Sequence, residues 1–172
     1  MRRAVLIALV VAVTLVPAAV AAVIKGTAGD DTLTGTSARD YIYAWAGNDT
    51  VTGSGGRDFV WGGSGNDAVT GNGGRDRVWG GPGDDDVTGG ANGDIWVAGG
   101  AGADTVKGGG GNDWVFGNAG GDTINGGSGD DHLFGGLGAD DIMCGAGADV
   151  AYVTALDTVA SDCERKVPAS SG

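Results

Sequence analysis

Aspartate recurs along most of this chain at a fixed spacing. Fourteen aspartates lie nine residues apart, with one interval of ten, and they are Asp31, Asp40, Asp49, Asp58, Asp67, Asp76, Asp85, Asp94, Asp104, Asp113, Asp122, Asp131, Asp140 and Asp149. Glu164 is the single glutamate among 22 acidic residues, which indicates that a short carboxylate is needed at fixed places in tight turns. Carboxylates among glycine-rich bends, together with the carbonyls that such bends free, form an all-oxygen ligand set that suits Ca²⁺. Mg²⁺ demands a smaller octahedral site, and softer metals want clustered His or Cys, which the repeats lack.

Each of these aspartates is the sixth residue of a nine-residue unit, Gly-Gly-x-Gly-x-Asp-x-aliphatic-x, of which residues 62–70 are a clear copy. The aliphatic residue at position eight has mostly polar or aromatic neighbours, a pattern that predicts a three-residue strand with its middle side chain inward. The six preceding residues, rich in glycine, turn the chain. Two units then make one coil of about 18 residues, so we predict an all-β fold, a parallel β-roll (β-solenoid) with short parallel strands on two faces.

Stacking such coils places aspartates two units apart directly above one another, in two columns of seven. The six gaps in each column bound the number of calcium ions at about twelve. One buried aliphatic side chain per unit contributes about 1.5–3 kcal/mol, whereas ordering nine residues costs on the order of 1–2 kcal/mol each in backbone entropy. We therefore expect folding to be coupled to calcium binding.

The unit resembles the calcium-binding nonapeptide of the RTX (repeats-in-toxin) family, and the resemblance covers roughly three quarters of the chain. It implies that backbone carbonyls of positions two and four join the aspartates as calcium ligands, and the glycines concerned are Gly63, Gly65, Gly81, Gly83, Gly109, Gly111, Gly127, Gly129, Gly136 and Gly138. The resemblance implies that family members carry a large upstream domain and a C-terminal export region, whereas we expect an N-terminal export signal in this chain.

The two ends of the chain differ from the repeats. Arg2 and Arg3 precede an apolar run at residues 4–16 that is shorter than the ~20 residues of a membrane span. We expect residues 1–22 to be a signal peptide, residues 23–152 the β-roll and residues 153–172 a C-terminal cap and tail. The mature protein is then secreted, extracellular and not inserted in a membrane. Cys144 and Cys163 are the only cysteines, and an even pair in an exported chain predicts a disulfide.

The outward positions of the predicted strands form two unlike faces. One face gathers nearly all the aromatic side chains, including Tyr43, Trp61, Trp79, Trp96, Trp114, Phe116 and Phe134. These rings could stack to stabilise neighbouring coils, form a homodimer or partner-docking face, or make a platform for sugars. The other face carries Thr-x-Thr pairs, which hint at ice binding. Arg39, Arg57 and Arg75 also recur in every second turn, where they would offset acidic charge or, less simply, bind a ligand.

Charge and motifs narrow the function. The net charge of −12 makes nucleic acid and anionic membranes poor partners. The sequence has no zinc-protease motif and no catalytic Ser/His/Asp arrangement, so we do not expect an enzyme. We expect calcium binding by an extracellular β-roll that folds on binding calcium and serves as a structural or interaction (adhesion-like) module. The alternative is a carbohydrate- or ice-binding protein that uses one of the two faces.

One interval between the repeated aspartates, from Asp94 to Asp104, is ten residues long. We expect Ile95 to be an extra residue there, in a β-bulge.

Overall fold

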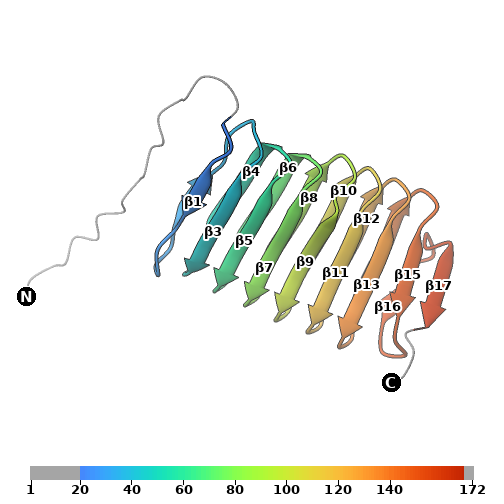
Figure 1. Cartoon of the computed structure of the whole chain (residues 1–172). Coiled ribbons are helices and arrows are strands. Elements are labelled where there is room, and N and C mark those ends of the chain that lie inside the picture. The colour runs from blue at the N-terminus through green and yellow to red at the C-terminus, as the bar shows by residue number, and fades with distance from the viewer. Residues whose placement is uncertain (1–19, 169–172) are drawn as a thin grey trace, which may run out of the picture.

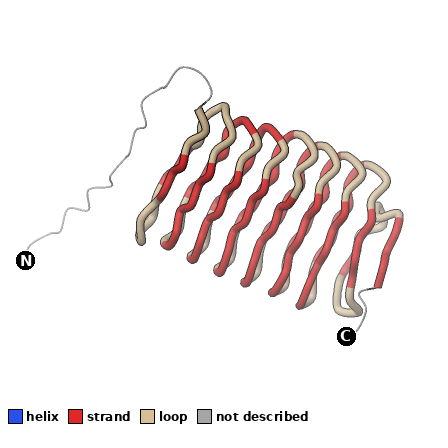
Figure 2. Tube along the Cα trace, viewed as in Figure 1, coloured by secondary structure: helices blue, strands red, loops and turns tan. Residues whose placement is uncertain are grey.

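The structure is a computed structural model and describes residues 20–168. Most of the predicted signal peptide therefore lies outside the described residues. Seventeen strands are arranged in two parallel sheets, and residues 20–168 contain no helix (Figures 1 and 2). Consequently, this part of the chain has no helix of the length and hydrophobicity that crossing a membrane requires.

Successive strands alternate between the two sheets. The nine-stranded sheet has the order β1 (Val23–Lys25), β3 (Tyr41–Ala46), β5 (Phe59–Ser64), β7 (Arg77–Pro82), β9 (Trp96–Ala101), β11 (Trp114–Ala119), β13 (His132–Leu137), β15 (Val150–Val153) and β17 (Arg165–Pro168). The eight-stranded sheet has the order β16 (Thr158–Val159), β14 (Asp141–Ala146), β12 (Thr123–Ser128), β10 (Thr105–Gly110), β8 (Asp86–Ala91), β6 (Ala68–Gly74), β4 (Thr50–Gly56) and β2 (Thr32–Thr34).

The register repeats with every second unit along most of the chain. Val60 of β5 pairs with Val78 of β7, and Val51 of β4 pairs with Val69 of β6. Each residue thus lies beside its counterpart one coil away, and the coils stack into an elongated solenoid with β1 and β17 at opposite ends (Figure 1). The predicted parallel β-roll is confirmed.

The strands are longer than the three residues predicted. Most span six residues, because the parallel pairing continues through positions one to three of the next unit. Between β4 and β6, for example, Ser54 pairs with Asn72 and Gly55 with Gly73. Glycine-rich positions leave no alternating side-chain pattern, so the sequence concealed this half of each strand.

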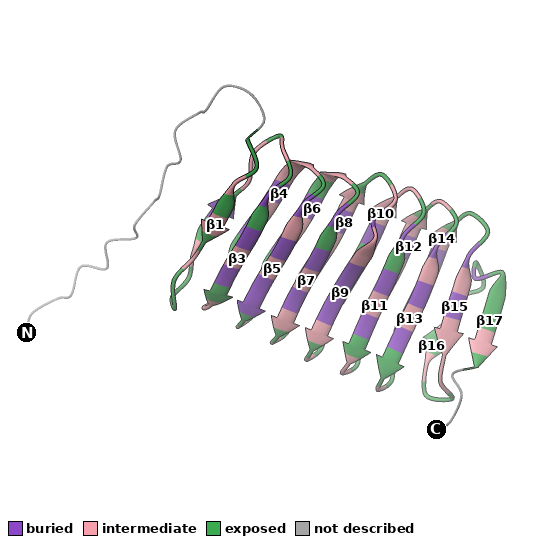
Figure 3. Ribbon diagram, viewed as in Figure 1, coloured by how far each residue is buried: buried purple, intermediate pink, exposed green. Residues whose placement is uncertain are grey.

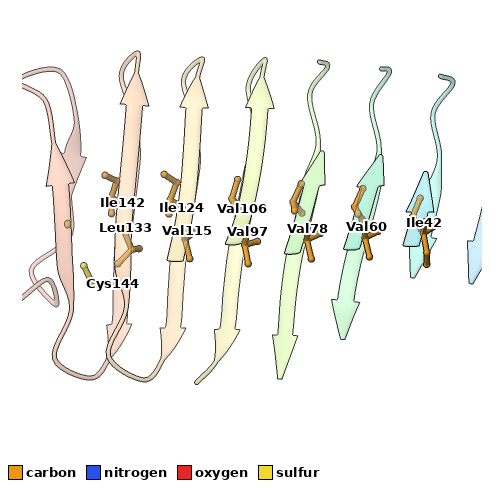
Figure 4. Packing of buried hydrophobic residues seen from close by; sticks show 14 of the residues in the cluster. Ile42, Val60, Val78, Val97, Val106, Val115, Ile124, Leu133, Ile142 and Cys144 are labelled. Carbon is orange, nitrogen blue, oxygen red and sulfur yellow. The ribbon is translucent and has the colours of Figure 1, made fainter. Parts of the chain in front are cut away.

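A single layer of aliphatic side chains fills the space between the two sheets. The inward residue at position eight is fully buried in nearly every unit, as for Val60, Val78, Val106 and Ile124 (Figure 4). In β2 to β15 the buried residues lie in the middle of the strand and the strand ends are half-buried or exposed, whereas β1, β16 and β17 have no buried residue (Figure 3). The core is therefore continuous along the solenoid but only one residue thick from each face.

The extra residue of the ten-residue interval is accommodated just before β9. Trp96 pairs with Arg77 and Val97 with Val78, so Val97 keeps the inward place and Ile95 is the residue inserted. The N–H of Ile95 donates to the carbonyl of Asp76 at 3.0 Å, the bond that a position-seven residue makes in other units. The insertion therefore leaves the register of the later coils intact.

The coil continues past the last repeat. β16 and β17 add one strand to each sheet, and β17 pairs in register with β15. Cys144 and Cys163 form the predicted disulfide, with 5.0 Å between their Cα atoms. The bond joins the last regular unit to the segment that covers the C-terminal end of the core.

Glycine at position two allows neighbouring coils to approach closely. Gly81 has a φ of 130°, and a methyl group added there would overlap the carbonyl oxygen of Gly63 in the coil before. Gly73, at position three, has an ordinary φ, and its added methyl group would lie 3.5 Å from the nearest atom, the carbonyl oxygen of Ser54.

We predict that Gly81→Ala lowers the free energy of unfolding by about 1–3 kcal/mol, because it combines backbone strain with a steric clash. Gly73→Ala serves as the matched control and should change stability by less than about 0.5 kcal/mol. Thermal denaturation followed by circular dichroism in saturating calcium measures both. Equal melting temperatures for the two variants would contradict the close approach at position two.

Candidate metal centre

The aspartates at position six form the two predicted columns, one along each edge of the roll. All but the first of the fourteen are buried. In each column, one carboxylate oxygen (Oδ1) accepts a hydrogen bond from the backbone N–H of the aspartate one coil earlier. The N–H of Asp49 donates to Asp67 at 2.8 Å, and that of Asp67 donates to Asp85 at 2.8 Å. This bond repeats along both columns and crosses the insertion from Asp94 to Asp113.

The second carboxylate oxygen (Oδ2) has no such partner in most coils. Among residues 20–168, twelve of these aspartates bury Oδ2 without a hydrogen bond, namely Asp49, Asp58, Asp67, Asp76, Asp85, Asp94, Asp104, Asp113, Asp122, Asp131, Asp140 and Asp149. Leaving a buried polar atom unsatisfied costs about 1–3 kcal/mol, and more when the group is charged. The repetition of this feature therefore indicates that the turns are built to receive a cationic partner.

Asp31 and Asp40, at the N-terminal end of the columns, differ from the others. Position two of their units is threonine, and the backbone N–H groups of Thr27 and Thr36 each donate to the neighbouring Oδ2 at 2.5 Å. The hydroxyls of the same threonines donate to these carboxylates at 3.0 and 2.9 Å. These two carboxylates are thus satisfied by the chain itself.

Backbone carbonyls face the gaps between stacked turns from both sides. The carbonyl oxygens of Gly63 and Gly65 point at Gly81 and Gly83 of the next coil, where an added methyl group would overlap them. In the other direction, the carbonyl of Gly80 lies 2.8 Å from where a methyl group on Gly62 would be. Glycine at these positions therefore leaves the space that carbonyl ligands need.

The other glycines predicted as ligands lie in equivalent places. The carbonyls of Gly109 and Gly127 face the next glycine of their column, and those of Gly111 and Gly129 do the same at position four. Gly136 and Gly138 belong to the last regular unit of the other column, where they meet the carbonyls of Asn118 and Gly120. The structure thus brings the predicted carbonyls and aspartates together in the same turns.

The donor set favours a hard cation. Within the described residues 20–168, no three His, Cys, Asp or Glu side chains gather as a metal cluster. A cation between two turns would therefore take its ligands from one or two carboxylates and from several carbonyls. Ca²⁺ accepts six to eight oxygen ligands in flexible geometry, and the residues present fit it.

Burial changes the acidity of the columns in the ion-free fold. Loss of solvent raises the pKa of Asp94 to about 8 and those of Asp58 and Asp113 to about 7. It raises the pKa values of Asp85, Asp104, Asp122 and Asp131 to about 6. The backbone hydrogen bond to Oδ1 lowers each pKa but offsets only part of the increase caused by burial. Neighbouring carboxylates raise the pKa further.

Two features of the columns escaped the sequence reasoning. Asp157 adds a further member to one column, because it accepts a bond from the N–H of Asp140 at 3.3 Å and one from the N–H of Thr154 at 2.6 Å. The sequence Asp157-Thr158-Val159 could have identified this aspartate, but the turn before it is shorter than in the repeats and breaks the spacing.

Asparagine and aspartate at position five form a second ladder of hydrogen bonds, in which the N–H of Asn66 donates to the side chain of Asn48 at 2.8 Å.

The predicted aromatic face lies on the outside of the nine-stranded sheet. Its rings contact one another from coil to coil, with centroids 3.9 Å apart for Trp96 and Phe116 and 4.7 Å for Phe116 and Phe134. Trp45, which sequence reasoning left out, joins this face through Trp61 at 6.2 Å. Stacking between coils is therefore one role of these side chains.

Comparison with known proteins agrees with this geometry. The family model for the RTX calcium-binding nonapeptide repeat matches in four copies, over residues 25–60, 61–95, 96–124 and 116–151. A search of curated proteins finds no match to the chain. The match spans most of the described chain, and the chain belongs to the RTX calcium-binding nonapeptide repeat family, whose repeats bind calcium in a β-roll.

Proposed function

We propose that this protein is an extracellular structural or interaction module, without enzymatic activity, that becomes ordered when calcium fills the gaps between its turns. The observation that carries the proposal is the row of buried, unpartnered carboxylate oxygens facing backbone carbonyls in both columns. A divalent cation would satisfy these oxygens and remove the repulsion between stacked carboxylates. The gaps between the fourteen repeated aspartates set an upper bound of about twelve ions, and Asp157 adds one further gap to its column.

Extracellular residence is supported by the disulfide. Disulfides persist in oxidising compartments and are rare in the cytosol. Millimolar calcium outside cells also suits weak, repeated sites, because extracellular modules bind calcium with Kd values of about 10⁻⁴–10⁻³ M.

Calcium should convert the protein from a largely disordered chain to the β-roll. We expect the β signal in circular dichroism to appear during a calcium titration and to be lost when a chelator is added. If metal-stripped protein shows the same spectrum and melting temperature as the calcium-loaded form, calcium-coupled folding is wrong.

Residues 84–86 offer a matched test of the site, because three aspartates follow one another. Asp85 is buried in the column, whereas Asp86 is exposed and faces Lys107 at 3.4 Å. Asp85→Asn should raise the calcium concentration at the folding midpoint. The shift is about tenfold if 1.4 kcal/mol is lost and one ion is coupled to folding, and it becomes smaller as more ions bind cooperatively. Asp86→Asn makes the same change of charge and should leave the midpoint nearly unchanged.

The raised pKa values give the ion-free and calcium-loaded forms opposite responses to pH. Unfolded Asp titrates near 3.9. Between about pH 4 and the folded values of about 6 to 8, the ion-free fold holds more protons than the unfolded chain, so raising the pH destabilises it. Calcium keeps the carboxylates ionised, so the unfolded chain then binds more protons in acid, and lowering the pH destabilises the loaded form.

We predict that the protein stripped of calcium by a chelating resin gains β structure as the pH falls from about 8 to about 4. The calcium-loaded protein should lose melting temperature over the same range. Thermal melts at several pH values measure both slopes. A metal-free protein whose stability rises with pH would show that the columns are not buried as carboxylic acids.

The aromatic face supports a second element of the proposal, which is self-association through the nine-stranded sheet. Trp114 lies on this face with 46% of its surface exposed although it contacts His132 and Phe134. Tyr41 and Trp45 are also exposed, and the other rings of the face are half-buried. A continuous aromatic row of this length is uncommon on the surface of a soluble monomer.

Sedimentation in calcium should therefore show a dimer. Trp114→Gln should weaken the dimer, because it removes the most exposed large ring in the C-terminal half of this face. Met143→Gln is the control, since Met143 is 39% exposed but lies on β14 of the other sheet. A monomer at every protein concentration would remove homodimerisation from the proposal.

A further inference from the structure

Arginine is concentrated at one place on this acidic protein. Arg39, Arg57 and Arg75 occupy position five of three alternate units, and Arg77 lies on the outer face of β7. These four residues, here called the arginine row, are half of the eight basic residues between 20 and 168. The rest of the roll is dominated by aspartate, so this local excess of positive charge needs a separate explanation.

The arginine row makes few contacts with the fold. All four side chains are exposed. Within residues 20–168, the one ion pair joins Lys107 and Asp86, so none of the four arginines is paired with an acid. Arg75 donates from Nε to the carbonyl of Gly93 at 3.1 Å, and the guanidinium groups of Arg39, Arg57 and Arg77 make no hydrogen bond in this part of the chain.

Charge compensation of the aspartate columns accounts for the row only in part: the charge of Arg75 lowers the pKa of Asp94, but compensation does not explain why only these turns carry arginine. The other column holds equally buried aspartates, and position five there is Asp30, Asn48, Asn66 or Asp84 in successive coils. Those side chains accept a backbone N–H from the next coil, as in the 2.8 Å bond to Asp30. The arginines thus occupy positions where the fold elsewhere uses a neutral or acidic hydrogen-bond acceptor.

The arginine row lines a groove. A hollow of about 170 Å³ is bounded by all four arginines together with Tyr41, Phe59, Ile95 and one acidic residue, Asp58. A second hollow of about 520 Å³ shares Arg57 and Arg75 and adds Asn92 and Asn112. Because two arginines border both hollows, the groove runs along the stacking direction and offers guanidinium groups, aromatic rings and amides in sequence.

We propose that the arginine row and its groove bind a linear acidic polysaccharide, a chain of sugars that carries carboxylate or sulfate groups at regular intervals. Guanidinium forks recognise such anions by paired hydrogen bonds. Parallel strands repeat at about 4.8 Å, so the row presents positive charge at short, regular steps. Tyr41, which is exposed and backed by the half-buried ring of Phe59, offers an apolar surface for a sugar ring. Asn92 and Asn112 offer hydrogen bonds to hydroxyls.

Calcium should control this site, and that part of the inference rests on the proposed function. Asp40, Asp58 and Asp76 follow the three turn arginines directly in sequence, and without cations their column opposes the approach of an anion. Calcium between the turns would cancel this negative charge and fix the arginines in register. The groove is then both formed and positively charged only in the loaded protein.

The test is titration of the full chain with short oligogalacturonate in saturating calcium, with dextran sulfate, neutral dextran and single-stranded DNA as parallel ligands. We expect oligogalacturonate or dextran sulfate to bind, with an affinity that falls as salt is added, and neutral dextran not to bind. The triple variant Arg39→Gln, Arg57→Gln, Arg75→Gln should lose at least about tenfold in affinity. The triple variant Lys25→Gln, Lys107→Gln, Lys166→Gln changes the net charge equally and should keep it.

Circular dichroism of each sample separates the two proposals. If calcium fails to order the protein, the proposed function fails. If the ordered protein ignores both acidic glycans, or binds them equally well without the three arginines, as bridging by calcium would allow, the inference is overturned. Stronger binding of DNA than of either glycan would also overturn it.

Discussion

The two oxygens of each buried carboxylate have different surroundings, and the whole roll depends on this difference. Oδ1 accepts the N–H of the aspartate one coil earlier, and this bond holds the side chain inside the turn. The same bond fixes Oδ2 in a buried place where most coils offer it no donor. The hydrogen bonding that stacks the coils therefore creates a repeated electrostatic cost, which a cation between the turns removes. In this fold, metal binding and coil stacking are two parts of one interaction.

Glycine and the thin core follow from the same constraint. Carbonyls face the gap between turns most openly where the next coil lacks a side chain, as Gly81 does opposite Gly63. The conformational cost of so much glycine is high, and the core offers one aliphatic residue per unit against it. Hydrophobic burial thus sets the register of the sheets, whereas in the proposed function ion binding would provide the stabilisation that the core cannot.

The sequence was sufficient to predict what depends on side-chain period. The spacing of aspartates predicted both columns. The match of residues 96–98 to residues 114–116 identified Ile95 as the extra residue, and the structure places Val97 inward beside Val78. The sequence was insufficient to predict features that are determined by backbone pairing or by turn length and not by side chains. Strand pairing through Gly55 and Gly73 leaves no pattern of side chains, and Asp157 follows a turn of irregular length. Trp45 was missed because it occupies position two with a φ of 85°, a place and conformation that favour glycine.

A solenoid is nearly one-dimensional, so its ends need a different solution from its interior. At three of the four column ends, threonine supplies what a cation would supply elsewhere. The N–H groups of Thr27, Thr36 and Thr154 donate to the second oxygen of Asp31, Asp40 and Asp157 at 2.5–2.6 Å. The Thr154 hydroxyl adds a bond to Asp157 at 2.9 Å. These terminal turns satisfy their carboxylates within the chain, so order at the ends does not require an ion on the open side of the first or last coil. The interior coils, which have neighbours on both sides, can then rely on cations held between two turns.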